Sequence, residues 1–173
     1  MINRFSLVLF LLLTAFSLEA VALKMTGFAK VEIVDPSVGG GGFDRLVANN
    51  DMNFGKILKP ESGSVTAVVS DTGNLSGTAQ YIDASGAPGT VDISGDSNET
   101  VSLVIRDTSV ISGMSLDNFT GSFGGQVMVG NSLTGATLTG GIDILNIGAS
   151  LTVDSTVSIG EHSPSYDVEV NYD

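Results

Sequence analysis

Short runs in which apolar and polar side chains alternate recur along the chain. The run LKMTGFAKVEIVDP, at residues 23–36, places apolar or small side chains at the odd positions as far as Ile33 and mostly polar ones at the even positions. The run YDVEVNY, at residues 166–172, has Tyr and Val at its even positions. Alternation with a period of two indicates a β-strand with one buried face. The pattern therefore predicts a strand after residue 22 and another at 166–172.

Eight further runs of this kind lie between those two, and turn-forming residues separate most of them. The predicted strands are 65–70, 78–85, 90–94, 100–105, 115–120, 126–130, 141–147 and 149–153. After residue 22 no stretch keeps an apolar period of 3.6 residues, and no repeat of fixed length is present, which disfavours a β-helix. Strands about ten residues apart predict an all-β sandwich.

A glycine-rich stretch, VGGGGFDRLVANN at residues 38–50, follows the first predicted strand. Glycine loses backbone entropy when it is ordered, so this composition predicts a pliable tether. A hairpin turn needs only about two to five residues, so the tether lets the first strand reach away from its own domain. We therefore divide the chain into an N-terminal strand at 23–37, a tether at 38–50 and a β-sandwich domain at 51–173.

The first 22 residues have the features of a secretory signal peptide. Arg4 precedes an apolar stretch from Phe5 to Phe16, and Ala20-Val21-Ala22 supplies the small residues of a cleavage site. A membrane anchor is the alternative, but its apolar core is shorter than the roughly 20 residues that span a bilayer. We expect cleavage before Leu23, and no transmembrane segment in what remains.

Charge and cysteine content narrow the functional classes. Without Arg4 and Glu19, six basic and eighteen acidic side chains leave a net charge of −12. Such a surface repels phosphate backbones, so we expect no nucleic-acid partner. The chain has no cysteine, so an exported domain of this sequence is held by packing and backbone pairing without disulfides.

Motifs for catalysis or metal binding are incomplete. Asp71-Thr72-Gly73 matches the aspartic-protease triplet, but that chemistry needs a second carboxylate loop. The acidic stretch 91–99 lacks the glycine and the bidentate glutamate of an EF-hand loop. His162 is the sole histidine, and with Glu161 alone it does not make a zinc site. Neither a Gly-x-Ser-x-Gly turn nor a phosphate-binding loop is present. We expect no enzyme activity, no cofactor and no metal.

Two segments resemble a known family of secreted bacterial domains. The segment Asp51-Met52-Asn53-Phe54-Gly55 and the C-terminal run Val168 to Tyr172 match the domain-of-unknown-function family 4402, and residues 79–93 match it more loosely. That family is similar to the pilin subunits of chaperone–usher fimbriae. The resemblance implies an immunoglobulin-like β-sandwich that lacks one strand, which a neighbouring subunit supplies.

The same resemblance implies partners and site residues. Tyr172 is the penultimate residue and Gly160 is fourteenth from the end, two positions that a periplasmic chaperone recognises in pilins. The implied function is that of a structural subunit of a surface fimbria that supports adhesion. It would be secreted through the periplasm by a chaperone and an outer-membrane usher, and would polymerise with itself head to tail. The implied residues are the donor-strand positions Met25, Gly27, Ala29, Val31 and Ile33 and the acceptor-edge positions Gly160, Tyr166, Val168, Val170 and Tyr172.

Two alternatives stay open at this point. The N-terminal strand can fold back onto its own sheet, because the alternation is the same whether it pairs with its own chain or with a neighbour. The chain would then be a complete monomeric sandwich, secreted as a binding module for carbohydrate or an extracellular protein. It has no tryptophan, which argues against an aromatic platform for sugar rings but not against a hydrogen-bonding site.

Overall fold

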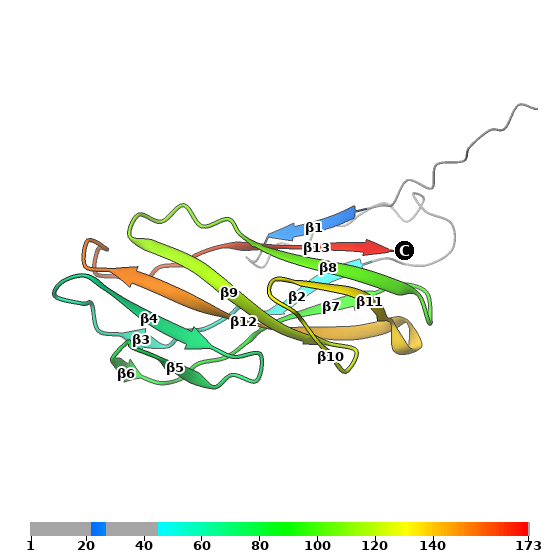
Figure 1. Ribbon diagram of the computed structural model, residues 1–173, viewed down its shortest axis with the longest axis horizontal. Coiled ribbons are helices and arrows are strands. Elements are labelled where there is room, and N and C mark those ends of the chain that lie inside the picture. The colour runs from blue at the N-terminus through cyan, green and yellow to red at the C-terminus, as the bar shows by residue number, and fades with distance from the viewer. Residues whose placement is uncertain (1–21, 27–44, 173) are drawn as a thin grey trace, which may run out of the picture.

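The computed structural model describes residues 22–26 and 45–172, and it is built almost entirely from β-strands (Figure 1). The strands are β1 (Ala22–Thr26), β2 (Arg45–Asn50), β3 (Lys56–Ile57), β4 (Ser64–Val69), β5 (Leu75–Gly77), β6 (Tyr81–Asp83), β7 (Gly89–Ser94), β8 (Thr100–Asp107), β9 (Met114–Phe123), β10 (Gln126–Val127), β11 (Ser132–Thr137), β12 (Ile142–Asp154) and β13 (Tyr166–Tyr172). One turn of 3-10 helix, η1 (Thr139–Gly141), precedes β12. The predicted all-β sandwich is confirmed.

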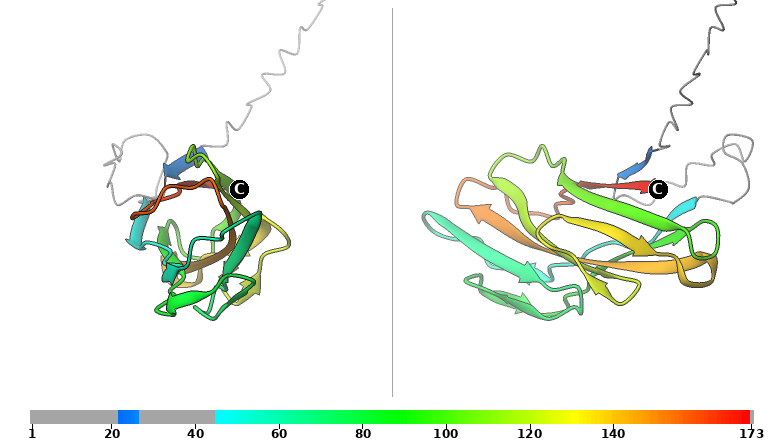
Figure 2. Two further views of the ribbon diagram at one scale, coloured as in Figure 1. Left: turned by 90° about the vertical axis from the view of Figure 1, so that its left-hand side faces the viewer. Right: turned by 45° about the vertical axis from the view of Figure 1, so that its right-hand side comes forward.

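Two antiparallel sheets form the two layers. The first has the order β1-β13-β8-β11. The second is built around β12, which pairs with β9 on one side and, on the other, with β7 along its first half and with β4 along its second half. Strand β2 extends this sheet beyond β7, β5 extends it beyond β4, and β3 and β6 form a small separate ladder. Seen end-on in Figure 2, the sheets enclose a common interior.

Alternating side chains from both sheets fill that interior. Buried positions alternate along β7 and along the first six residues of β8, as the period-two pattern requires, whereas β12 is buried continuously from Ile147 to Leu151 and β13 from Tyr166 to Val168. The fully buried side chains include Val91 and Ile93, Leu103 and Ile105, Leu145 and Ile147, and Val168 and Val170. Strand β13 therefore contributes to the centre of the core.

Gly148 lies where β12 changes its partner from β7 to β4. A Cβ atom at this position would lie 2.4 Å from the carbonyl oxygen of Val69 and 2.6 Å from the backbone nitrogen of Asp71. The glycine allows this close backbone approach, and the strand runs through it without interruption. The two strands predicted at 141–147 and 149–153 are consequently one strand of 13 residues.

The predicted tether at 38–50 is wrong for residues 45–50. These residues form β2, which pairs with β7 from Arg45↔Ser94 to Asn50↔Thr90. The sandwich therefore begins at Arg45, six residues earlier than predicted. The rest of the predicted tether, like residues 27–37 of the predicted N-terminal strand, lies outside the described residues.

Candidate acceptor edge and groove

Strand β13 lies between two neighbours in its sheet. On one side it pairs with β8 along its whole length, from Tyr166↔Asp107 to Tyr172↔Val101. On the other side it pairs antiparallel with β1, from Ala22↔Asn171 to Thr26↔Asp167. The N-terminal strand thus covers the outer edge of β13 within this single chain, as Figure 1 shows.

The predicted acceptor residues of β13 are central to the packing. Val168 and Val170 are fully buried and Tyr166 is buried. The Tyr172 hydroxyl donates a hydrogen bond of 2.9 Å to the carbonyl oxygen of Ser94, which ties β13 to the opposite sheet through β7. These four residues come together on one strand, whereas Gly160 lies in the irregular segment that leads into it.

Of the predicted donor-strand residues, the structure describes only the backbone of Met25, which lies opposite Val168. Gly27, Ala29, Val31 and Ile33 lie outside the described residues. The neighbouring register pair is Leu23↔Val170. The odd positions of β1 are therefore opposite the fully buried Val168 and Val170.

Tyr166 begins β13 in an apolar environment. Its ring centroid lies 6.0 Å from that of Phe119 at an interplanar angle of 51°. Its hydroxyl packs against Gly89, where a Cβ atom would lie 2.4 Å from the hydroxyl oxygen. Burial raises the pKa of Tyr166 to about 12, and the negative charge of Asp51 adds to the effect. The side chain is thus held as the neutral phenol at neutral pH.

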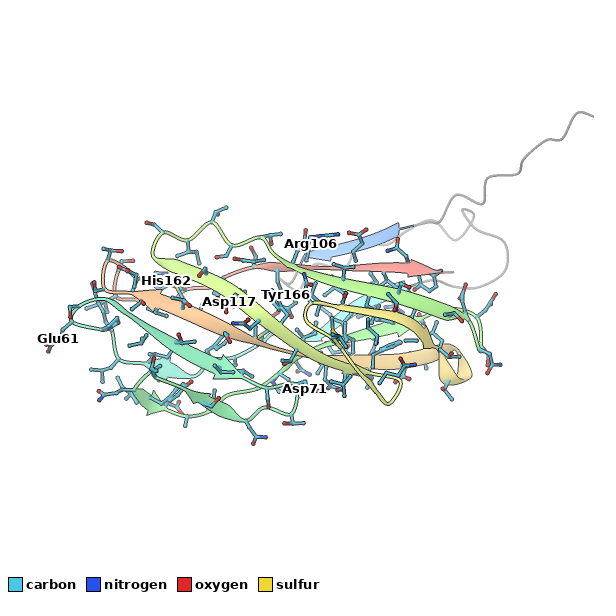
Figure 3. All side chains as sticks on the ribbon, viewed as in Figure 1. Glu61, Asp71, Arg106, Asp117, His162 and Tyr166 are labelled. Atoms are coloured by element: carbon cyan, nitrogen blue, oxygen red, sulfur yellow. The ribbon has the colours of Figure 1, made fainter. Side chains whose placement is uncertain are left out.

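A groove of about 1130 Å³ begins at Tyr166 and continues beyond the start of β13. One wall is the segment Ser158–Pro164, and the other is the segment Asp51–Lys59 that follows β2. Apolar side chains of the sandwich interior form its base: Met114, Leu116, Leu151, Val153 and Val157. Figure 3 shows His162 in the first wall, at the end of the molecule beyond Tyr166.

The rim of this groove carries exposed apolar side chains. Leu58 is 49% exposed, Ile82 is 67% exposed and Ile159 is 90% exposed, and all three line the groove. Large aliphatic side chains that gather around a hollow of this size are typical of a surface that binds another apolar group. Sequence reasoning missed the groove because its walls are about 100 residues apart in the chain.

The other candidate residues have ordinary structural roles. Asp71-Thr72-Gly73 is part of the turn between β4 and β5, which is closed by a hydrogen bond from the Ser70 backbone nitrogen to the Asn74 carbonyl oxygen. The Glu99 carboxylate accepts a hydrogen bond from the backbone nitrogen of Asp96, and an Nε2 contact of 2.8 Å joins His162 to the Ser158 carbonyl oxygen. Within residues 22–26 and 45–172, no group of three or more His, Asp or Glu side chains could hold a metal ion. No helix in the same ranges is long and apolar enough to cross a bilayer.

Comparison with known proteins supplies a family for the sandwich. A family profile described as domain of unknown function (DUF4402) matches residues 45–172. The chain belongs to the DUF4402 family. The DUF4402 match runs from the first residue of β2 to the last residue of β13, so it covers both sheets and leaves β1 outside. No curated protein and no solved structure matches the chain.

Proposed function

We propose that this DUF4402 chain is a structural subunit of a bacterial surface fibre and that it assembles by strand donation. One observation carries the proposal. The outer edge of β13, a strand at the centre of the core, is covered by β1, and β1 lies outside the family match and far along the chain from β2. In the fibre, β1 and the residues that follow it would pair with β13 of the next subunit.

The outer edge of β13 needs a strand to cover it. If β1 leaves, the outer edge of β13 presents unpaired N–H and C=O groups next to the buried Val168 and Val170. A bare edge of this kind pairs readily with any strand that offers a complementary ladder. An incoming strand from a second copy restores the ladder and covers the core, as in donor-strand complementation.

The side chains of the donor strand add to the backbone pairing. Burial of Met25, Val31 and Ile33 in a neighbour would contribute roughly 1.5–3 kcal/mol each, or about 5–9 kcal/mol before the cost of ordering the segment. Ala29 and Gly27 would contribute little burial. Backbone pairing along β13 adds to this gain and offsets the cost of ordering the segment.

The length of chain between β1 and β2 permits donation to a neighbour. Because the donor strand continues to residue 34, the linker is residues 35–44, ten residues that span at most about 35 Å when fully extended. Donor and acceptor are different surfaces of one subunit, so the contact is head-to-tail and propagates along a fibre. If two copies instead exchange their β1 strands with each other, the product is a domain-swapped dimer.

The proposal includes features that rest on the resemblance to pilins. The sandwich would be immunoglobulin-like and complete only with the donated strand. A periplasmic chaperone would hold the β13 edge until an outer-membrane usher delivers the subunit to the cell surface, where the fibre supports adhesion. The two-sheet arrangement and the position of β13 support this, because the edge that β1 covers lies next to the core.

Deletion of residues 23–34 from the mature chain tests the proposal. The intact chain is expected to form a series of species that lengthens with protein concentration in sedimentation velocity. The deletion variant, held by its periplasmic chaperone at the bare β13 edge, should keep its β-rich circular dichroism spectrum but stop at one subunit. A deletion variant that assembles as well as the intact chain would overturn strand donation.

Two point variants serve as matched controls. Val31→Asp places a charge at an odd position of the donor strand, and Glu32→Lys changes the charge at the adjacent even position. Val31→Asp is expected to reduce assembly strongly because it buries an unpaired carboxylate, whereas Glu32→Lys should have little effect. Equal effects would mean that the alternation has been misread.

A monomeric binding module is the second candidate, and the pairing of β1 with β13 inside one chain favours it. In that case β1 would complete the sheet permanently, and the molecule would act alone on a carbohydrate or an extracellular protein. A single sharp monomer at all concentrations, with residues 23–34 protected from protease, would support the module over the fibre.

A further inference from the structure

We infer that the groove between residues 51–59 and 158–164 is the seat of donor-strand residues 27–34 from a second copy of this chain. The inference rests on the proposed function and specifies which residues of the donor meet which residues of the acceptor. It starts from the register of β1 on β13, in which the two residue numbers of every pair add up to 193.

Continued beyond Thr26, this register leads along the groove. Position 27 comes opposite Tyr166, position 31 opposite His162, and position 33 opposite Gly160. All three acceptor residues line the groove. The direction agrees, because β1 runs antiparallel to β13 and so points toward the start of β13 and the segment before it (Figure 1). A strand that continues straight from β1 therefore enters the groove.

The first wall of the groove has main-chain groups available for such a strand. Among residues 22–26 and 45–172, none makes a backbone–backbone hydrogen bond with residues 159–164. Buried or edge backbone groups are normally paired with backbone or with water. An incoming strand can extend the ladder of β13 along this wall.

The interior of the groove suits the donor's alternation. Its base consists of side chains from the sandwich core, including Leu116, Leu151 and Val153, which β12 and β9 present at this end. At this end of the molecule the first sheet stops, because β13 begins only at Tyr166 and β8 ends at Asp107. Irregular segments cover the second sheet there. The odd donor positions carry Ala29, Val31 and Ile33. A volume of about 1130 Å³ compares with the roughly 300–1,000 Å³ of clefts that enclose drug-sized ligands, so it can hold several such side chains.

Engineered cysteines test this register directly, because the chain has none of its own. One batch of mature chain carries Val31→Cys and another carries His162→Cys, and the two are mixed in urea, refolded together and oxidised. Opposed residues in an antiparallel pair have Cα atoms about 4.5–5.5 Å apart, within the range of a disulfide. We expect a disulfide between the two variants.

Two further pairs make the result decisive. Val31→Cys mixed with Ser158→Cys is the off-register control, since four residues along a strand add about 13 Å and prevent the bond. Lys24→Cys mixed with Glu169→Cys reports strand donation at the register that the structure gives. A bond between copies at 24/169 but not at 31/162 would keep the proposed function and overturn the groove inference. No bond between copies in either mixture would overturn both.

An unmodified chain provides the second readout. His162 is the sole histidine, so its modification by diethylpyrocarbonate can be followed without any substitution. Occupation of the groove is expected to slow this modification severalfold in assembled material relative to the 23–34 deletion variant. The same rate in both samples would contradict a strand seated beside His162.

Discussion

The buried phenol of Tyr166 gives the sandwich a stability that depends on alkaline pH. Tyr166 is 5% exposed, and burial, with a smaller contribution from the charge of Asp51, raises its pKa to about 12. The pKa of tyrosine in an unfolded chain is about 10. Because the folded pKa is the higher one, the neutral form is favoured by folding. Its contribution is fully present below pH 10 and is lost as the pH rises from about 10 to about 12.

The size of this loss follows from the shift. One pKa unit corresponds to about 1.4 kcal/mol, so a shift of about two units corresponds to about 3 kcal/mol. We therefore expect the free energy of unfolding of the wild-type chain to fall by about 2 kcal/mol more than that of Tyr166→Phe between pH 8 and pH 12, where the folded-state phenol is half ionised. At pH 7 the two should differ by about 1 kcal/mol or less, because the described residues give the Tyr166 hydroxyl no hydrogen-bond partner.

Urea unfolding followed by circular dichroism measures both free energies at each pH. The absence of tryptophan and the presence of only three tyrosines allow tyrosinate absorbance to be titrated in parallel. Tyr166→Phe should remove the step of highest pKa from that titration. If Tyr166→Phe loses as much stability as the wild type over the same pH range, the buried phenol is not the cause and this reasoning is wrong.

Urea unfolding also checks three predictions about packing and charge. Gly148→Ala should cost about 3 kcal/mol, near the upper end for overpacking, because its Cβ would meet the backbone of Val69 at 2.4 Å. Gly63→Ala is the control, because Gly63 has a φ of +66° and a Cβ atom there would meet no atom within 4 Å. It should cost only about 1–2 kcal/mol, the cost of a left-handed backbone for a residue with a side chain, and equal losses in the two glycine variants would refute the steric argument. Leu145→Ala should cost about 2–5 kcal/mol because the side chain is fully buried, and a loss below 1 kcal/mol or so would contradict its place in the core. Arg106→Ala should cost less than about 1 kcal/mol, since its ion pair with Glu169 is solvent-exposed, and a larger loss would mean that the pair is more than a surface contact.

Period-two alternation predicted the strands that bury one face. β4, β7, β8 and β13 were found near their predicted bounds because each has apolar residues at every second position. β9 was also found, although its buried positions change phase between Leu116 and Phe119. The short strands β3 and β5 were missed, and so were two strands of six residues, β2 and β11. The sequence RLVANN of β2 has no clear alternation and follows a run of glycines, and SLTGAT of β11 contains a glycine and an irregular register between Leu133 and Ala136. Both strands are ordered by tertiary pairing, which overrides a weak local signal.

The candidate site was only partly visible in the sequence. Alternation placed Tyr166, Val168 and Val170 on one buried face, and the structure confirms that face. The groove was not predicted, because it depends on how residues 51–59 and 158–164 come together after folding. Gly148 was interpreted as a break between strands, whereas its lack of a side chain serves the close approach of β4.

The identity of the chain that supplies the strand beside β13 is the central question. Two single-cysteine variants, Lys24→Cys and Glu169→Cys, are mixed during refolding and then oxidised, and the mass of the products answers the question. The double variant, with both cysteines in one chain, is the reference for a disulfide inside one chain. Strand donation predicts that the mixture gives a disulfide-linked product of two chains and that the double variant gives a series of disulfide-linked oligomers of many chains. A double variant that closes only on itself, with no product from the mixture, would contradict donation and establish a self-contained sandwich.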